Sequence, residues 1–481
     1  MKHLKEKSSH KRNIFNFLRW PILAAQAITS ILVIGSINKL ALLKPWQNSL
    51  VVIFILILLA FNILKLFSER SKASTKAICL LGAIILSIAF SFAHKYARQT
   101  IDFIQNATGD HYETQTYSVL VLNSGNFTEI SQLKNQSVGF LSTNPNLEAT
   151  KDRLSTEVTY RANDYEELGA MMAALSGYRT SAIVLSDSYL TYLEEEQSDF
   201  YQTTRSIFTF EVRSEETDTR KPVEVATEPF IVYISGSDSR GGIRDIARSD
   251  VNILAVINPT QNKILLVSIP RDYYVQLHGT TGTRDKLTHA GIYGINMSRQ
   301  TIEDLLGYDI NYTVKVGFHT VERVVDVLDG VDIYSDKAFK GANSCYFTEG
   351  IQHLDGKCAL SFSRERYAYE SGDRHRGQNQ QAVLTAIIKK LQQPKYAVKY
   401  SDILKAAEGS FETSLTYEEI TDFARYQLNS LAEWQVESIS LDGYGDMLPT
   451  YSMGAQRLYV MIPDESTIAN AKQKIAEYLE Q

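Results

Sequence analysis

The stretch that decides the fold is Phe230-Ile231-Val232-Tyr233-Ile234-Ser235-Gly236-Ser237-Asp238-Ser239-Arg240. Its first half is an unbroken apolar run, which predicts a strand, and its polar second half lies where that strand ends. Arginine and aspartate recur downstream in Arg248-Ser249-Asp250, Ser268-Ile269-Pro270-Arg271-Asp272, Arg364-Glu365-Arg366 and Asp373-Arg374-His375-Arg376. Guanidinium groups pair with phosphate oxygens through two hydrogen bonds, and carboxylates hold hard divalent cations. The pattern therefore predicts a site for a metal-bound, multiply charged phosphate.

The charges are divided unevenly along the 481 residues, whose net charge is −6. Residues 1–100 contain 14 Lys and Arg against 2 Asp and Glu, whereas the remainder contains 35 against 53. A large acidic portion argues against nucleic acid as a partner, because nucleic-acid binders carry the opposite sign. Solvated ion pairs are the alternative explanation for each arginine, but the gathering of seven arginines in a few short motifs weakens that explanation.

Three apolar runs in the first hundred residues indicate a membrane anchor: Trp20–Ile37, Leu50–Leu64 and Ala77–Ala93. Each is near, or somewhat short of, the ~20 residues that a helix needs to cross a ~30 Å hydrocarbon layer, and flanking residues can complete the span. A soluble helical bundle is the alternative, and a cleaved signal peptide fits poorly because three runs follow one another. We therefore predict that residues 1–100 form an anchor with three transmembrane helices.

The basic residues around these runs predict their orientation. The segment before the first run carries six Lys and Arg, the first loop carries Lys39 and Lys44, and the second loop carries four. Basic loops stay in the cytoplasm, so the N-terminus and the second loop are expected there. Three spans then make this a multi-pass protein of the cell membrane whose part after about Lys95 is extracellular. Any chemistry of that part proceeds without cytoplasmic ATP.

The cysteines are compatible with an exterior location. Cys79 lies in the third apolar run, which leaves Cys345 and Cys358, 13 residues apart, as the exterior pair. In an oxidising compartment such a pair favours a disulfide that closes a surface loop. Two unrelated free thiols are the alternative.

The rest of the chain is predicted to divide into an accessory α/β domain at 110–213, a polar linker at 214–228 and a catalytic domain at 229–481. Near-continuous apolar runs such as Ile264–Val267 predict strands buried on both faces, in a sheet that helices cover. The expected fold class is α/β, with an α-β-α sandwich as the catalytic domain. The accessory domain shows no catalytic constellation, so a spacer or recognition role is expected of it.

Among its expected elements are a strand at Glu157–Tyr160 and a helix at Tyr165–Leu175, and the catalytic domain is expected to contain a helix at Ala290–Leu306.

An ordered series of motifs over residues 229–392 resembles the LytR–CpsA–Psr family, and in particular its streptococcal capsule-assembly branch. The series is Ser-Asp-Ser-Arg at 237–240, Arg-Ser-Asp at 248–250, Ile-Pro-Arg-Asp at 269–272, Asp-Lys-Leu-Thr-His-Ala at 285–290, Leu-Asp-Gly-Lys-Cys-Ala-Leu at 354–360, Arg-Glu-Arg at 364–366 and Gln-Gln-Ala-Val-Leu at 380–384. The resemblance implies a hydrophobic tunnel for a polyprenyl chain. It also implies transfer of a capsular or wall glycopolymer from a polyprenyl-pyrophosphate carrier to peptidoglycan.

The resemblance also implies roles for individual residues. Asp238 and Asp250 would lie at a Mg²⁺ ion, directly or through water, and Arg271, Arg364 and Asp250 would be catalytic. The residues expected around the pyrophosphate are Arg240, Arg248, Arg271, Arg364, Arg366, Arg376 and Gln380. One departure is Asn379, where family members often have arginine; Arg374 is a candidate replacement. A site aspartate is the candidate general base.

Three functions compete at this point. The first is the membrane-anchored glycopolymer phosphotransferase, in which a divalent cation and fixed guanidinium groups offset the charge of the phosphate under attack. The second is a polyprenyl-pyrophosphate phosphatase, in which water replaces the acceptor sugar. The third is a non-catalytic membrane regulator of polysaccharide assembly, which would have no need for the series of Asp and Arg.

Overall fold

The computed structural model describes residues 2–108, 112–215, 217–237, 242–369, 372–430 and 433–480. It divides into two compact units. We call them the helical unit, Met1–Asn106 with Tyr417–Ala432, and the α/β unit, Ala107–Thr416 with Glu433–Gln481.

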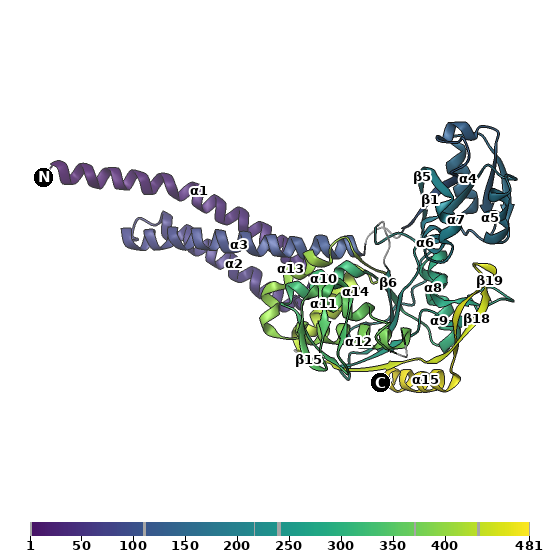
Figure 1. The fold of residues 1–481 in the computed structure, drawn as a ribbon. Coiled ribbons are helices and arrows are strands. Elements are labelled where there is room, and N and C mark those ends of the chain that lie inside the picture. Colours follow the sequence, from purple (N-terminus) through teal and green to yellow (C-terminus); the bar gives the residue numbers. More distant parts are fainter. Residues whose placement is uncertain are drawn as a thin grey trace. The chain divides into compact units, whose positions relative to one another are not determined.

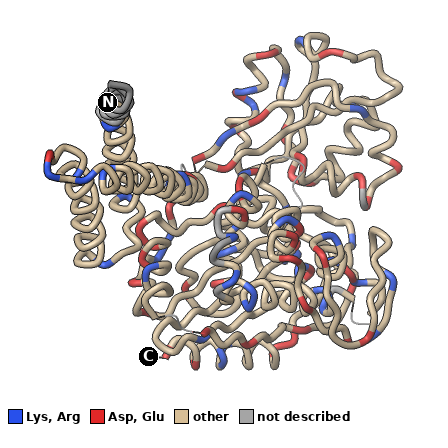
Figure 2. The backbone as a smooth tube through the Cα atoms, turned by 90° about the vertical axis from the view of Figure 1, so that its left-hand side faces the viewer, with Lys and Arg blue, Asp and Glu red and all other residues tan. Residues whose placement is uncertain are grey.

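The helical unit contains three helices that, within the described residues, are long and apolar enough to cross a membrane. The candidate spans are Phe17–Leu40 at the end of α1 (Lys2–Leu40), the whole of α2 (Pro45–Phe67) and the whole of α3 (Ala73–Ala107). The three predicted apolar runs fall inside them, and the protein is membrane-associated. Figure 2 shows charged residues spread over the α/β unit, while these helices carry few along their described length.

The three long helices run up, down and up. The Trp20 and Phe67 rings, from the beginning of the first span and the end of α2, lie 5.0 Å apart. At the opposite end, Lys39 Nζ at the end of α1 donates to Gln105 Oε1 near the end of α3 at 3.5 Å. Two polar contacts join the helices in between: a buried one from Asn62 to Gln26 at 3.0 Å and a partly buried one between Ser36 and His94 at 2.7 Å. Such contacts give these polar side chains the hydrogen-bond partners that lipid hydrocarbon does not provide.

A later segment, α14 (Tyr417–Ser430), belongs to the same unit. Its Tyr417 hydroxyl donates to the carbonyl of Lys39 at 2.9 Å, and Arg425 Nε donates to the carbonyl of Ala41 at 2.8 Å. Both acceptors lie where α1 turns into α2. Helix α14 and the α1–α2 turn therefore lie on the same side of any membrane that α1 and α2 cross.

The main sheet of the α/β unit, whose strand β6 is labelled in Figure 1, has the strand order β16-β11-β6-β7-β8-β17. Strands β6 to β8 form an antiparallel meander, while β11 runs parallel to β6, and β17 runs parallel to β8. The strands are β6 (Phe230–Ser237), β7 (Val251–Asn258), β8 (Lys263–Ser268), β11 (Tyr312–Gly317), β16 (Phe411–Thr413) and β17 (Gln435–Ser440).

Helices cover both faces of the main sheet. Val267 and Leu265 point to the face where α9 (Ile295–Leu306) and α15 (Glu465–Leu479) pack, in a core with Ile302 and Ile475. Ser268 points to the opposite face, because side chains alternate along a strand. There α12 (Asp373–Leu391) approaches so closely that a Cβ on its Gly377 would lie 2.6 Å from Ser268 Oγ. The predicted α-β-α sandwich is confirmed.

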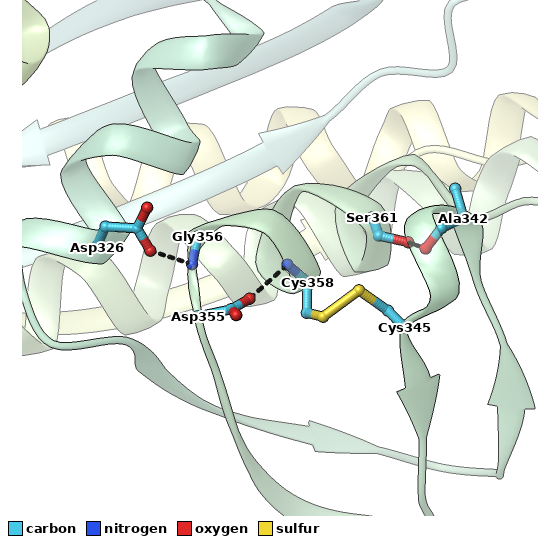
Figure 3. Close-up of a disulfide and its surroundings, with 7 residues drawn as sticks. All are labelled: Asp326, Ala342, Cys345, Asp355, Gly356, Cys358 and Ser361. Atoms are coloured by element: carbon cyan, nitrogen blue, oxygen red, sulfur yellow. Dashed lines mark hydrogen bonds between the residues drawn. A yellow bond between two sulfur atoms is a disulfide. The ribbon is translucent and has the colours of Figure 1, made fainter.

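Next to α12 packs α11 (Gly356–Arg364), α10 (Phe318–Val327) packs beside α11, and α13 (Tyr400–Ala407) packs beside α10. The structure joins Cys345 to Cys358 by a disulfide of 2.10 Å, which fixes the first turns of α11 to the preceding loop (Figure 3). The Asp355 side chain caps this helix by accepting from the amide of Cys358 at 2.8 Å. The short strands of this part are β12 (Val331–Ser335), β13 (Phe339–Lys340), β14 (Tyr346–Phe347) and β15 (Gly350–Leu354).

The accessory sheet has the order β3-β2-β4-β1-β5. Its strands are β1 (Tyr112–Leu122), β2 (Ser137–Leu141), β3 (Arg161–Tyr165), β4 (Ala182–Ser186) and β5 (Thr204–Glu215). Its helices are α4 (Leu147–Ser155), α5 (Leu168–Ser176), α6 (Asp187–Glu196) and α7 (Ser198–Gln202). The remaining elements of the α/β unit are β9 (Tyr274–Val275), β10 (Asp285–Lys286), α8 (Leu287–Ala290), β18 (Gly443–Thr450) and β19 (Gly454–Pro463).

Two element predictions are wrong, and the helix expected at Tyr165–Leu175 is wrong at its start, because Tyr165 ends β3 and α5 begins only at Leu168. The strand expected at Glu157–Tyr160 lies instead at Arg161–Tyr165, whose sequence Arg-Ala-Asn-Asp-Tyr is largely exposed at the sheet edge and so lacks an apolar signal. The helix expected at Ala290–Leu306 is interrupted, and α9 begins only at Ile295. Gly294 has a φ of +99°, which is incompatible with an α-helix and explains the break.

Candidate functional site

An open cavity of about 1000 Å³ lies in the α/β unit, where motifs from distant parts of the sequence meet. Two of the predicted site residues, Asp238 and Arg240, lie outside the described residues. The others all line this cavity: Arg248, Asp250, Arg271, Arg364, Arg366, Arg376 and Gln380.

The sheet topology explains why the first motifs converge. Strand β6 ends at Ser237, β7 begins at Val251 directly after Asp250, and β8 ends shortly before Arg271. Because β7 runs antiparallel to both β6 and β8, the end of β6, the start of β7 and the end of β8 lie at the same end of the sheet. Gly236 permits the close pairing there, since a Cβ on it would come within 2.7 Å of Val251 Cβ.

A buried hydroxyl network holds the backbone of the Arg248–Asp250 motif. Ser249 Oγ lies 2.7 Å from Ser235 Oγ and 3.0 Å from the Tyr233 hydroxyl, and it donates to the carbonyl of Val251. The amide of Asp250 donates to the carbonyl of Gly236 at 2.9 Å. Ser249 therefore fixes the backbone of the motif. The side chains of Arg248 and Asp250 are positioned by that backbone and are not needed to stabilise it.

Asp250 and Arg271 form the central ion pair of the cavity, with Nη1 to Oδ1 at 2.8 Å. Burial alone would raise the pKa of Asp250, but the charges of Arg271, Arg248 and Arg376 outweigh it and lower the pKa below its ordinary value. Asp250 is therefore an anion at neutral pH. Next to it, Asp272 accepts from Lys286 at 3.0 Å and also lies near Arg271.

Three more arginines come from one face of the main sheet, where α11, the segment that follows it and α12 contribute one each. Arg364, at the end of α11, lies over the Phe318 ring, with 5.1 Å from Cζ to the ring centroid. Arg366 lies over the ring of Tyr367 and donates to its hydroxyl at 2.5 Å. Arg376 is in the first turn of α12 and is 9% exposed. Two guanidinium groups of the cavity thus pack against aromatic rings, which limits the orientations that they can adopt.

The departure at Asn379 has a structural explanation. Asn379 is buried, and its Nδ2 donates to the carbonyl of Phe362 at 3.1 Å, which ties α12 to α11. Arg374 pairs with Asp442 at 2.6 Å and is not among the described residues that line the cavity. The suggestion that Arg374 replaces a basic contact at the site is therefore not supported.

Sequence reasoning missed several residues of the cavity. Phe318 and His319 begin α10, directly after β11, and β11 is parallel to β6 and so ends at the same edge of the sheet. Knowing that β11 pairs with β6 in parallel would have predicted that Phe318 and His319 lie at the cavity. No sequence signal pointed to the lining residues from the accessory sheet with its helix α6, or from the segment before β7: Thr116, Asp187, Ser188, Thr191, Glu196, Asp245, Ile246 and Ala247.

The donor groups fit a magnesium ion that is shared with a substrate. Within the described residues, no group of three or more His, Cys, Asp and Glu could hold a metal by itself. Magnesium commonly takes one or two carboxylates together with substrate phosphates and water. Asp250 provides an ionised carboxylate. Ser237 Oγ, a buried atom, has no hydrogen-bond partner in the described part of the chain, and its residue lines the cavity.

Fold and cavity together define a membrane-associated α/β protein whose arginines can attract a multiply charged anion. The model of the LytR_cpsA_psr family matches residues 197–475, so the chain belongs to this family. It is 36% identical over 219 residues to the polyisoprenyl-teichoic acid–peptidoglycan teichoic acid transferase TagU of Bacillus cereus, with 45% of this chain and 71% of that protein aligned. For the TagU of Bacillus subtilis the identity is 32% over 254 residues, 53% of this chain and 79% of that protein.

Among solved structures, B. subtilis TagV superposes with a TM-score of 0.44 and 27% identity, covering 53% of this chain and 98% of that one. The family assignment rests on the family model and the two transferases, not on this superposition. Both transferases are Bacillus proteins named for teichoic acid. The narrower expectation of a streptococcal capsule branch is therefore not supported by these relatives.

Proposed function

We propose that this protein transfers a wall glycopolymer from a polyprenyl-pyrophosphate carrier to peptidoglycan at the outer face of the cell membrane. The observation that carries the proposal is the convergence of Arg248, Asp250, Arg271, Arg364 and Arg376, from separate motifs, on one cavity. Membership of the LytR_cpsA_psr family and the names of the two TagU relatives support it. The names favour a teichoic-acid-type polymer as the first candidate, with capsular polysaccharide as the second.

The arginines supply most of the proposed chemistry. Arg271 and Arg364 would pair with pyrophosphate oxygens and offset the negative charge that opposes attack. The oxygen of an acceptor hydroxyl then forms a bond to the phosphorus that carries the glycopolymer. The bond from this phosphorus to the bridging oxygen breaks, and polyprenyl monophosphate leaves with the electron pair. The hydroxyl proton passes to a base or to water. The carrier is already an activated anhydride, so no ATP is consumed.

Asp250 is better suited to holding a metal than to accepting that proton. Its arginine neighbours lower its pKa, which makes it a weak base at neutral pH. We assign Mg²⁺ to Asp250 and Ser237, together with Asp238, which lies outside the described residues. A bound Mg²⁺ would supply further neutralisation of phosphate charge.

The proposed topology puts the N-terminus in the cytoplasm and the α/β unit outside. The basic N-terminal segment and second loop support this direction. The contact between α14 and the α1–α2 turn supports the number of spans between the N-terminus and the α/β unit, while the basic residues alone set the direction. With three spans, the chain after α3 emerges on the side of the first turn, which is where α14 binds.

The test uses the purified full-length protein, a radiolabelled lipid-linked glycopolymer and peptidoglycan. We expect label to enter peptidoglycan, with release of polyprenyl monophosphate that depends on the acceptor. If the label appears only in soluble polymer phosphate, water is the acceptor, and the protein is a phosphatase and not a transferase. Absence of any cleavage by folded protein supplied with Mg²⁺ would favour the regulator.

A further inference from the structure

The cavity has a second wall, which comes from the accessory sheet and its helix α6. Asp187, Ser188, Thr191 and Glu196 of α6 line it, together with Thr116 of β1. Asp187 and Glu196 are separated by nine residues, which corresponds to ~13 Å along a helix axis. The wall is therefore longer than a single sugar ring.

Helix α6 is fixed to the rest of the cavity. Ser188 Oγ donates to the carbonyl of Ile246 at 3.1 Å, and the Tyr192 hydroxyl donates to Gln456 Oε1 at 2.6 Å. Tyr189 and Leu193 share one hydrophobic core with Met453 and Leu458, the latter on β19. A shared core of this kind makes the wall a permanent part of the cavity.

The two walls differ in charge. The strand ends and the α11–α12 segment contribute arginines, whereas α6 contributes carboxylates and hydroxyl groups. Carboxylates repel phosphate, so a pyrophosphate binds on the arginine side. The groups that suit the α6 side are neutral hydrogen-bond donors, and sugar hydroxyls have that chemistry.

Two further features point to a glycan. A volume of about 1000 Å³ is at the upper end for a small-molecule site, which leaves room for sugar rings beside a pyrophosphate. Tyr367 also lines the cavity and is 83% exposed, so its ring offers a flat apolar surface on which the C–H face of a sugar can pack.

We propose that the α6 wall binds the acceptor glycan and determines which acceptor the enzyme uses. This inference rests on the proposed transferase function and adds to it a role for the accessory sheet. Glu196 and Asp187 would accept hydrogen bonds from acceptor hydroxyls. The Thr191 hydroxyl donates to the carbonyl of Asp187 at 3.0 Å and would accept a further hydrogen bond. The residues act on binding and orientation of the acceptor, not on the bonds to phosphorus.

The test measures transfer by the full-length protein at varied concentrations of purified peptidoglycan glycan strands and of lipid-linked donor. Glu196→Gln and Asp187→Asn each remove one charge while keeping the shape of the side chain. We expect either substitution to raise the KM for glycan strands about tenfold, as expected for loss of a charged hydrogen bond, with the KM for the donor unchanged. Asp152→Asn is the matched control, because Asp152 is an exposed carboxylate on α4 that does not line the cavity.

The outcomes separate this inference from the function on which it rests. Failure of the wild-type protein to transfer would remove the proposed function itself. Transfer by the wild type with an unchanged acceptor KM in a folded Glu196→Gln variant would overturn only the role of α6. A raised KM for the donor alone would also overturn it, because the wall would then contact the carried polymer. Because Asp187 is in the first turn of α6, Glu196→Gln keeps the test decisive if Asp187→Asn misfolds.

Discussion

Two arginine–carboxylate pairs in the α/β unit have the same separation and different surroundings. Arg271 Nη1 lies 2.8 Å from Asp250, and Arg299 Nη1 lies 2.8 Å from Glu303. Arg299 is 3% exposed in the core, where Glu303 also accepts from the amide of Ile310 and from Lys221. The Arg271 pair instead lines a large cavity, next to Arg248 and Arg376.

A short distance between an arginine and a carboxylate therefore does not distinguish an arginine that stabilises the fold from one that binds a ligand. In the Arg299 pair each carboxylate contact is with the protein itself, so removing the arginine leaves a buried charge short of a partner. Asp250 instead lies near three arginines, Arg271, Arg248 and Arg376, and lines an open cavity. Arginines gathered at a cavity can stabilise an anionic ligand.

The largest expected effect is on stability, from Arg299→Ala. This substitution leaves Glu303 partly uncompensated in the core, and we expect a loss of about 3–5 kcal/mol in the free energy of unfolding. Denaturant unfolding of the full-length protein in detergent measures the change. Transfer per folded molecule should stay at the wild-type value. Unchanged stability would remove the distinction between the two pairs.

The second effect is on activity, from Arg271→Ala. Loss of a charge-assisted contact to the pyrophosphate should slow transfer by at least ~100-fold, comparable to losing one oxyanion donor. The circular dichroism spectrum should not change, because the hydroxyl network around Ser249 holds the local backbone. Arg457→Ala, an exposed arginine on β19, is the control and should retain wild-type transfer. If folded Arg271→Ala transfers at the wild-type rate, Arg271 has no part in binding the pyrophosphate, and its role is structural like that of Arg299.

A smaller loss is expected from Arg271→Lys. The charge is kept, but the planar fork that makes two parallel hydrogen bonds is not. The rate of transfer should lie between those of the wild type and Arg271→Ala, roughly tenfold below the wild type. Full recovery by lysine would indicate that charge alone is needed at this position.

The smallest effect is the pH dependence of the Asp250 pair. The folded-state pKa of Asp250 is lowered, so its contribution to stability is present above the unfolded pKa and is lost as the pH falls through the folded pKa. The wild type and Asp250→Asn should therefore differ in melting temperature at pH 7, and the gap should shrink below about pH 3.9. A gap that persists unchanged at pH 3 would mean that the charge of Asp250 is not what the arginines stabilise.

Much of the main sheet and of the arginine wall could be predicted from the sequence. Apolar runs locate β6, β7 and β8, and the polar motifs at their ends converge through the antiparallel pairing of those strands. The start of α10 at Phe318 was missed because it requires knowing that β11 pairs with β6 in parallel. The accessory wall was missed for a different reason. Its docking depends on a core shared between Leu193 and Leu458, and no local pattern encodes a contact so distant in sequence.

The central claim is that the strand-end arginines and those of α11 and α12 bind one pyrophosphate. The most direct measurement is a structure of the full-length protein with a polyprenyl pyrophosphate bound. We expect pyrophosphate oxygens about 3 Å from the guanidinium nitrogens of Arg271 and Arg364, inside the cavity. A pyrophosphate bound elsewhere, with both guanidinium groups out of contact with it, would contradict the account.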